Sequence, residues 1–175
     1  MESKGVDSKD QLSGDAAIEK VRALLPQFKS AMMVTHTSTG DVHVRPLALQ
    51  GDLTTFGGVL WFFTDERSRK VQESAGRVPV SIICQSDQQS AYLHLTGVAT
   101  VVRDLPKMRE LYSPILKTWF PDGLDDPNLT LIKFEANGGA YWDSPGGMLR
   151  SLAAFGVAIV TGRPTKAGEA GDLHL

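Results

Sequence analysis

The sequence predicts an α+β fold that is mainly β, with an antiparallel sheet or small barrel and a few inserted helices. Six or seven segments have the length and composition of strands, and most of them are joined by short turns. One segment, residues 91–102, alternates along its length between two faces. Helical periodicity is confined to a few segments, and no internal repeat occurs.

The composition indicates one ordinary globular domain. The chain has 175 residues, with 18 Lys and Arg against 20 Asp and Glu, and its formal net charge is −2. This balance argues against an extended nucleic-acid interface, which requires a basic domain. The single cysteine, Cys84, excludes an intramolecular disulfide, and no Cys/His pattern for zinc is present.

Both ends of the chain are expected to lie outside the folded domain. Residues 1–14 are polar and predict a disordered arm, and their lack of an apolar stretch argues against a signal peptide or a membrane anchor. Residues 163–175 contain Gly, Pro and charged residues and predict a flexible tail. We therefore expect one domain over residues 15–162, in a cytoplasmic protein without a membrane span.

The first elements are a helix and a hairpin. Apolar residues recur at spacings of three and four after Asp15, which predicts a helix capped by Asp15 and ending at about Lys29. Residues 31–37 and 42–49 then predict two strands, joined by a turn at residues 39–41.

The middle of the chain is mostly extended. Residues 59–64 form an almost unbroken apolar run, which predicts a buried strand. A helix over residues 67–75, ended by Gly76, and a strand over residues 78–85 follow. In the strand over residues 91–102, the core face is expected to carry Ala91, Leu93, Leu95, Gly97, Ala99 and Val101.

Three helices and two strands are predicted after residue 103. Asp104 caps a helix with Pro106 in its first turn, and Pro114 starts a second short helix. The expected apolar stripe of this region is Met108, Leu111, Ile115 and Trp119. The remaining elements are strands over residues 129–135 and 140–143, joined through residues 137–139, and a helix over residues 149–161.

Residues 62–70, with the sequence FFTDERSRK, are a candidate anion site. The free N–H groups and the positive dipole at a helix N-terminus attract phosphate. Thr64, Ser68, Arg69 and Lys70 would supply hydroxyl donors and positive charge to such an anion. The alternative is an ordinary solvated helix start whose charged side chains point into water.

A second candidate is Arg45-Pro46, inside a predicted strand. Proline lacks an N–H group, so it belongs at a sheet edge, at a bulge, or where a ligand interrupts the pairing. Arg45 shares its face with His43 and Leu47, from which it could reach a phosphate near the strand. The alternative is an edge-strand proline that only discourages aggregation.

Other residue types point away from metal or nucleophilic chemistry. His36 and His43 lie on opposite sides of a turn, but no third ligand has a matching spacing. Cys84 is expected to be a buried packing thiol. Motifs of the types G-x-S-x-G, Walker A and G-x-G-x-x-G are absent from the sequence. Tyr141 and Trp142 are adjacent on a strand, so one ring is expected in the core and the other in solvent.

Several motifs occur together in a characteristic order. They are RPL at residues 45–47, LWFFT at 60–64 with Ser68 and Lys70, YLHLTGVA at 92–99, WFPDG at 119–123, DP at 126–127 and YWD at 141–143. Over roughly 145 residues, from about residue 18 to residue 162, this order resembles the FMN-binding split-barrel superfamily. Within it, the chain resembles the general stress protein branch of the pyridoxamine 5′-phosphate oxidase-like proteins.

The resemblance implies a six-stranded antiparallel split β-barrel that forms a homodimer and binds FMN in clefts at the subunit interface. The implied phosphate ligands are Arg45, Ser68, Arg69 and Lys70. Pro46 and Leu47 would line the isoalloxazine ring, Phe63 and Thr64 would contact the ring and its polar edge, and Tyr92 and Trp142 would come from the second subunit.

One departure from the resemblance concerns the substrate. Trp142 is followed by DSPGGMLR, without the basic Arg-x-His segment that grips the substrate phosphate in pyridoxamine-phosphate oxidases, so vitamin B6 oxidation is not expected. One hypothesis is an FMN-dependent oxidoreductase of unknown substrate. The other is a non-enzymatic flavin-binding or flavin-sensing protein, favoured by the lack of a recognisable acid–base pair. The resemblance also allows haem or a deazaflavin in the cleft.

Overall fold

A computed structural model describes residues 10–37, 39–67, 77–143 and 169–175. Eight strands of the described residues belong to one sheet, whose main path runs β1-β8-β7-β6-β5-β2-β3, with β4 paired to β7. The strands are β1 (Asp10–Ser13), β2 (Ser30–His36), β3 (Val42–Ala48), β4 (Val59–Asp65), β5 (Val78–Ser86), β6 (Ala91–Val102), β7 (Leu129–Asp143) and β8 (Glu169–His174).

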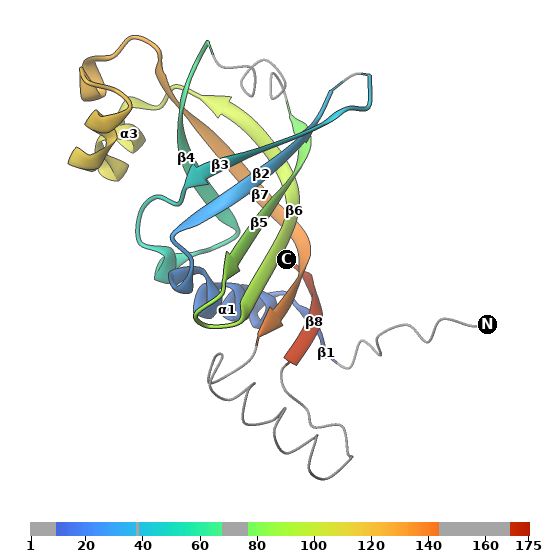
Figure 1. Ribbon diagram of the computed structural model, residues 1–175. Coiled ribbons are helices and arrows are strands. Elements are labelled where there is room, and N and C mark those ends of the chain that lie inside the picture. The colour runs from blue at the N-terminus through green and yellow to red at the C-terminus, as the bar shows by residue number, and fades with distance from the viewer. Residues whose placement is uncertain (1–9, 38, 68–76, 144–168) are drawn as a thin grey trace.

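Six of these strands form the barrel, in the order β3-β2-β5-β6-β7-β4, and every pairing along this path is antiparallel. In the described part of the chain no ladder joins β3 to β4, so the barrel is open there (Figure 1). We call this opening between β3 and β4 the seam. The predicted α+β fold with an antiparallel barrel is confirmed.

The barrel core follows from the alternation of side chains along its strands. On β6 the residues expected to face the core are buried from Ala91 to Ala99, which confirms that prediction. On β2, Ala31 and Met33 are buried while Met32 between them is exposed. The largest side chains that fill the barrel interior include Phe28, Met33, Phe62, Ile82, Leu93, Leu95, Ile132 and Phe134.

Two strands at the ends of the chain are a correction to the sequence prediction. Residues 10–13 form β1 and residues 169–174 form β8, where a disordered arm and a flexible tail were expected. The two strands pair in parallel, with Leu12 opposite Leu173, and β8 pairs antiparallel with β7. Leu173 is buried among core residues. These strands are too short and too polar to show a period of two in the sequence. They form because β8 pairs with the edge of β7 and β1 pairs with β8.

β7 is also a correction, since one strand of 15 residues replaces the two strands predicted around residues 137–139. Gly138 pairs with Thr96 and Gly139 with Leu95, so the glycines sit within the ladder to β6. A Cβ atom at Gly139 would collide with the carbonyl oxygen of His94. The glycines therefore allow close approach of two strands, and they do not mark a loop.

The first helix is shorter than predicted. Helix α1 runs over Asp15–Leu24 and is followed by a 3₁₀ helix, η1 (Leu25–Gln27), with Pro26 in its first turn. Gly14 occupies the N-cap position, so Asp15 is the first helical residue and not the cap that we expected. The buried face of α1, formed by Ala17, Val21 and Leu24, covers one end of the barrel (Figure 1).

A helical insertion, residues 105–125, connects β6 to β7. It consists of α3 (Leu105–Leu111) and two 3₁₀ helices, η3 (Pro114–Thr118) and η4 (Gly123–Asp125). The predicted cap is confirmed, because the Asp104 carboxylate accepts a hydrogen bond of 3.0 Å from the Lys107 amide. Pro114 starts a new helix as expected. Another 3₁₀ helix, η2 (Leu53–Thr55), lies between β3 and β4.

The apolar stripe predicted for this insertion is only half correct. Met108 and Leu111 are buried, but Ile115 and Trp119 are 64% and 62% exposed. Leu116 is buried in their place, because the helix that begins at Pro114 has its own phase. Met108, Leu111 and Leu116 form a second core with Phe63, Leu129 and Leu131, on the outside of the barrel.

The predicted helices over residues 67–75 and 149–161 lie outside the described residues, apart from Arg67. Among the helices that the structure does describe, none has the length and apolar character needed to cross a membrane.

Candidate functional site

A cavity of about 440 Å³ opens at the seam, between the ends of β3 and β4 and the helical insertion. We call it the seam cavity. It brings together Pro46, Leu47, Phe63 and Thr64, four of the residues predicted to bind a cofactor. Its other lining residues are Ser30, Ala48, Gln50, Asp65, Leu116, Trp119 and Phe120.

The β3 wall of the cavity is formed by Pro46, Leu47 and Ala48. β3 ends the strand path of the sheet, so Pro46 lies on an edge strand, as predicted. An edge strand has one unpaired side, where the missing N–H group of proline costs no ladder hydrogen bond. Leu47 is 6% exposed and belongs to the barrel core. This wall is therefore apolar and fixed by core packing.

The β4 wall is formed by Phe63, Thr64 and Asp65. Phe63 points outward into the second core, and Thr64, directly after it, is 1% exposed. The Asp65 carboxylate accepts hydrogen bonds of 2.7 Å from the amide and 2.8 Å from the guanidinium of Arg67. These contacts raise the pKa of Arg67.

Arg45 precedes Pro46 on β3 but does not line the seam cavity. Its guanidinium donates a hydrogen bond of 3.3 Å to the hydroxyl of Thr35, a buried residue of β2. His43, Arg45 and Leu47 alternate with exposed residues along β3, which confirms that they share a face. The other predicted phosphate ligands, Ser68, Arg69 and Lys70, lie outside the described residues.

Tyr92 and Trp142 are not part of the seam cavity. They pair with each other across β6 and β7, and their exposed fractions are 41% and 48%. Tyr141, the neighbour of Trp142, is buried with 2% exposure. The prediction that one ring of this pair lies in the core and the other in solvent is confirmed.

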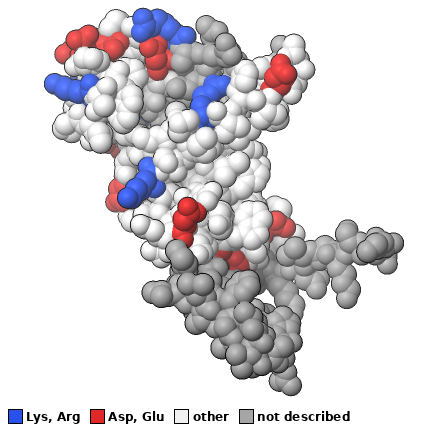
Figure 2. Space-filling model, in the orientation of Figure 1, with Lys and Arg blue, Asp and Glu red and all other residues white. Residues whose placement is uncertain are grey.

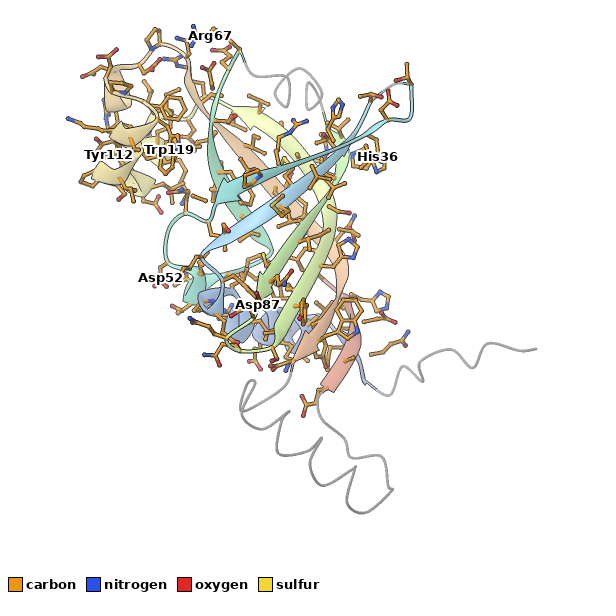
Figure 3. All side chains as sticks on the ribbon, viewed as in Figure 1. His36, Asp52, Arg67, Asp87, Tyr112 and Trp119 are labelled. Carbon is orange, nitrogen blue, oxygen red and sulfur yellow. The ribbon has the colours of Figure 1, made fainter. Side chains whose placement is uncertain are left out.

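The helical insertion contributes a wall of the cavity that was not predicted from the sequence. Leu116, Trp119 and Phe120 line the cavity opposite the strands. Figure 3 shows Trp119 and Tyr112 on the insertion and Arg67 near the end of β4. The WFPDG motif at residues 119–123 marked this segment, but nothing in its spacing related it to β3 or β4.

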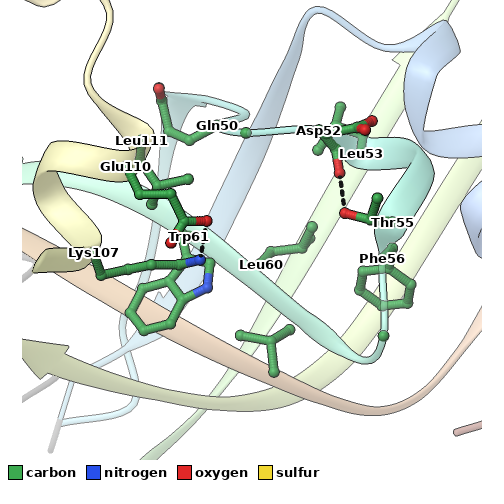
Figure 4. Close-up of a pocket in the computed structure, with 13 residues that line it drawn as sticks. Gln50, Asp52, Leu53, Thr55, Phe56, Leu60, Trp61, Lys107, Glu110 and Leu111 are labelled. Atoms are coloured by element: carbon green, nitrogen blue, oxygen red, sulfur yellow. Dashed lines mark hydrogen bonds and ion pairs between the residues drawn. The ribbon is translucent and has the colours of Figure 1, made fainter.

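A second cavity, of about 270 Å³, lies between β4, the segment around η2 and helix α3 (Figure 4). The Lys107 ammonium lies 5.6 Å from the ring centroid of Trp61 and 2.6 Å from the Glu110 carboxylate. Gly51 approaches Leu111 so closely that a Cβ atom there would lie 2.9 Å from its methyl group. The Lys107–Trp61 and Leu111–Gly51 contacts attach α3 to the barrel, and Gln50 lines both cavities.

The described residues contain no group of three or more His, Cys, Asp and Glu side chains that could hold a metal ion. His94 is hydrogen bonded through its Nε2 atom to the Ser81 hydroxyl at 3.0 Å. Cys84 is buried, as predicted, and this burial raises the pKa of its thiol to about 12. A thiol with this pKa stays protonated near neutral pH and is a poor nucleophile.

The sequence from residue 16 to residue 166 matches the model of a family described as pyridoxamine 5′-phosphate oxidase like. The chain belongs to this family. One relative is Protein bli-3 of Neurospora crassa, which is 27% identical over 160 residues, 86% of this chain and 76% of the relative.

Solved structures show the same fold. A putative general stress protein 26 from Jannaschia sp. CCS1 has a TM-score of 0.76 at 24% identity, covering 89% of this chain and 96% of that protein. The general stress FMN/FAD binding protein from Xanthomonas citri has a TM-score of 0.65 at 23% identity, covering 77% and 94%. A heme binding protein from Mycobacterium smegmatis has a TM-score of 0.57 at 17% identity, covering 78% and 57%. The split-barrel resemblance to general stress proteins is thus confirmed.

Proposed function

We propose that this member of the pyridoxamine 5′-phosphate oxidase-like family binds a flavin, FMN, in the seam cavity. One observation carries the proposal: Pro46, Leu47, Phe63 and Thr64, which come from two separate sequence segments, line one cavity. A relative of the same fold from Xanthomonas citri is described as binding FMN or FAD.

The cavity fits a flat ring. Ligand sites of this kind have mostly apolar walls and a few fixed polar groups. Leu47, Phe63, Leu116 and Phe120 supply apolar surface, and the buried Thr64 supplies a hydroxyl beside it. The volume of about 440 Å³ is within the ~300–1,000 Å³ typical of small-molecule sites.

The phosphate of FMN would bind Arg45, Ser68, Arg69 and Lys70. Charge-assisted hydrogen bonds to phosphate are roughly twice as strong as neutral ones. Arg45 is the described member of this group, and its bond to Thr35 holds the guanidinium on the face that it shares with Leu47. A bound flavin supplies hydride and electron transfer, while the chain holds the ring and excludes water from one side of it.

We also propose that two copies of the chain form a homodimer through the outer face of β2, β3, β5 and β6. The outward positions of these strands carry no Lys, Arg, Asp or Glu, and Figure 2 shows a largely uncharged surface over them. Met32 lies directly opposite Pro46 on β3 and Ile83 on β5. Met32 and Ile83 are 38% and 41% exposed. A continuous exposed apolar patch is typical of a protein interface.

The same face carries Tyr92, while Trp142 is paired beside it on β7. In a dimer these two rings could approach the cavity of the partner subunit, which agrees with their separation from the cavity of their own subunit. We therefore propose that they complete the flavin site across the interface.

The dimer proposal predicts that Ile83→Lys weakens self-association about tenfold or more, since charged residues are disfavoured in interface cores. The solution mass, measured by light scattering over a range of concentrations, tests this. Ile115→Lys is the matched control, because Ile115 has 64% exposure but lies on the helical insertion. A wild-type protein that is monomeric at every concentration would contradict the proposal.

Two functions are consistent with a bound flavin, and they differ in whether the protein catalyses a reaction of a substrate. The first is an FMN-dependent oxidoreductase of unknown substrate. The second, a non-enzymatic flavin carrier or sensor, is favoured by one observation: Asp65 is the one ionisable residue among the described residues that line the cavity, and its carboxylate is bound to Arg67. A general acid or base is otherwise lacking from that lining.

The proposed function predicts a yellow protein with about one flavin per subunit, since each barrel has one seam. The visible spectrum of freshly purified protein, before and after addition of FMN, measures this and distinguishes a flavin from haem or a deazaflavin. Anaerobic bleaching by NAD(P)H at turnover rates of ~1–1,000 per second would support the oxidoreductase. A colourless protein that takes up no added FMN would refute flavin binding.

A further inference from the structure

Trp119 combines a large exposed apolar surface with a place in the wall of the seam cavity. Its exposed fraction is 62%, although the neighbouring cavity residues Leu116 and Phe63 are only 4% and 7% exposed. Isolated exposed apolar side chains are common, whereas apolar and aromatic side chains that line a cavity are typical of a small-molecule site. Tryptophan is also the side chain with the largest flat area for contact with another ring.

The backbone at Trp119 is firmly held. The amide of Trp119 donates a hydrogen bond of 3.0 Å to the carbonyl oxygen of Leu116, and the Phe120 amide donates one of 2.9 Å to the same oxygen. Leu116 itself is anchored in the second core. The indole therefore projects from a fixed support, so little backbone ordering is needed when it contacts a ligand.

Trp119 differs from the other exposed apolar residue of this segment in its position relative to the cavity. Ile115 lies on the short helix η3, which ends directly before Trp119, and is exposed to the same extent, yet it does not line the cavity. Exposure and position in the cavity wall are therefore separate properties here. Both side chains are exposed, but of the two only Trp119 lines the cavity between the insertion and the strands.

We propose that Trp119 contacts the ring of the bound flavin from within the same subunit, as the aromatic wall opposite Pro46 and Thr64. This inference rests on the proposed flavin site and adds a ring contact on the side of the helical insertion. It also predicts a property of the bound ligand. An indole in contact with a photoexcited flavin donates one electron to it and recovers that electron in the dark, so fluorescence is lost without net chemistry.

The test uses full-length protein freed of flavin and titrated with riboflavin and with FMN. Trp119→Ala is expected to weaken both ligands by about tenfold, because loss of a ring contact is independent of the phosphate. Trp119→Phe keeps a ring and is expected to retain affinity within about threefold. Phenylalanine is a much poorer electron donor than indole. Because Trp142 of the partner subunit is assigned to the same site and would also quench, the flavin fluorescence is compared in a Trp142→Phe background, where adding Trp119→Phe is expected to raise it severalfold.

Two control variants make the result specific. Ile115→Ala is expected to change neither affinity nor fluorescence. Trp142→Phe tests the other exposed tryptophan, which we assign to the site of the partner subunit. If fluorescence recovers fully in Trp142→Phe alone, adding Trp119→Phe raises it no further and Trp119→Ala leaves the affinity unchanged, the proposal is overturned while flavin binding stands. Wild-type protein that binds neither riboflavin nor FMN overturns both proposals. Far-ultraviolet circular dichroism confirms that the variants fold.

Discussion

Replacing Arg45 and Lys70 together by alanine is expected to weaken FMN binding by ~10²–10⁴-fold and to change riboflavin binding by less than about threefold. A hydrogen bond to a charged group contributes about 1.5–3 kcal/mol, so the loss of two amounts to about 3–6 kcal/mol. Each 1.4 kcal/mol corresponds to about a factor of ten in affinity. Riboflavin has the same ring but no phosphate, and the seam cavity that would hold this ring does not include Arg45.

The measurement is a fluorescence titration of the flavin-free double variant with each ligand. Arg67→Ala is the matched control, because Arg67 is a cation in the same segment but is 70% exposed and paired with Asp65 at 2.8 Å. It is expected to leave the affinity for FMN within about threefold, since exposed ion pairs contribute little. An equal loss of FMN and riboflavin in the double variant would mean that the phosphate binds elsewhere.

Features with a strict period or a strong local signal could be predicted from the sequence. The alternation in residues 91–102 predicted β6 and its core face. A strand with one face on the core buries every second side chain, because successive side chains point to opposite faces. The apolar run at residues 59–64 predicted β4, which has core on both faces. Pro46 indicated an edge strand, because proline lacks the N–H group needed within a sheet.

Features that depend on tertiary contacts could not be predicted. β1 and β8 contain little apolar surface, and their pairing follows from the free edge of β7. Trp119 was expected on one apolar stripe with Met108 and Leu111, although Pro114 was expected to start a second helix. The helix that starts at Pro114 buries Leu116 instead, and Trp119 lines the seam cavity. No local pattern in the sequence indicates that residues 116–120 lie across the cavity from strand residues about 50 to 75 positions earlier in the chain.

β6 and β7 also approach each other closely at Gly97, where the register between the two strands shifts. A Cβ atom at this position would collide with the carbonyl oxygen of Glu135 and would lie 2.8 Å from two ring carbons of Phe134. Neither neighbour can move easily. Phe134 is completely buried, and this part of β7 is paired to β6 on one side and to β4 on the other.

Gly97→Ala is therefore expected to lower the free energy of unfolding by about 3 kcal/mol or more, at the upper end of the effects of overpacking. For a chain of this length, that corresponds to a fall in Tm of roughly 6–12 °C. Thermal and urea unfolding followed by circular dichroism measure it. Gly57→Ala is the control, because the nearest atom to its added Cβ is 4.0 Å away.

The control is expected to change the free energy of unfolding by less than about 0.5 kcal/mol, as is usual for surface substitutions. If Gly97→Ala is recovered only as aggregates while Gly57→Ala is soluble, the loss of stability in Gly97→Ala is larger than expected and the prediction is still supported. Equal stability of the two variants would show that β7 can yield at Glu135. Glu135 is also paired with Val59 at the start of β4, the strand that forms one wall of the seam cavity. A shift of β7 at Glu135 would therefore move β4 as well. In that case the flavin affinity would change while the stability of the protein stayed the same.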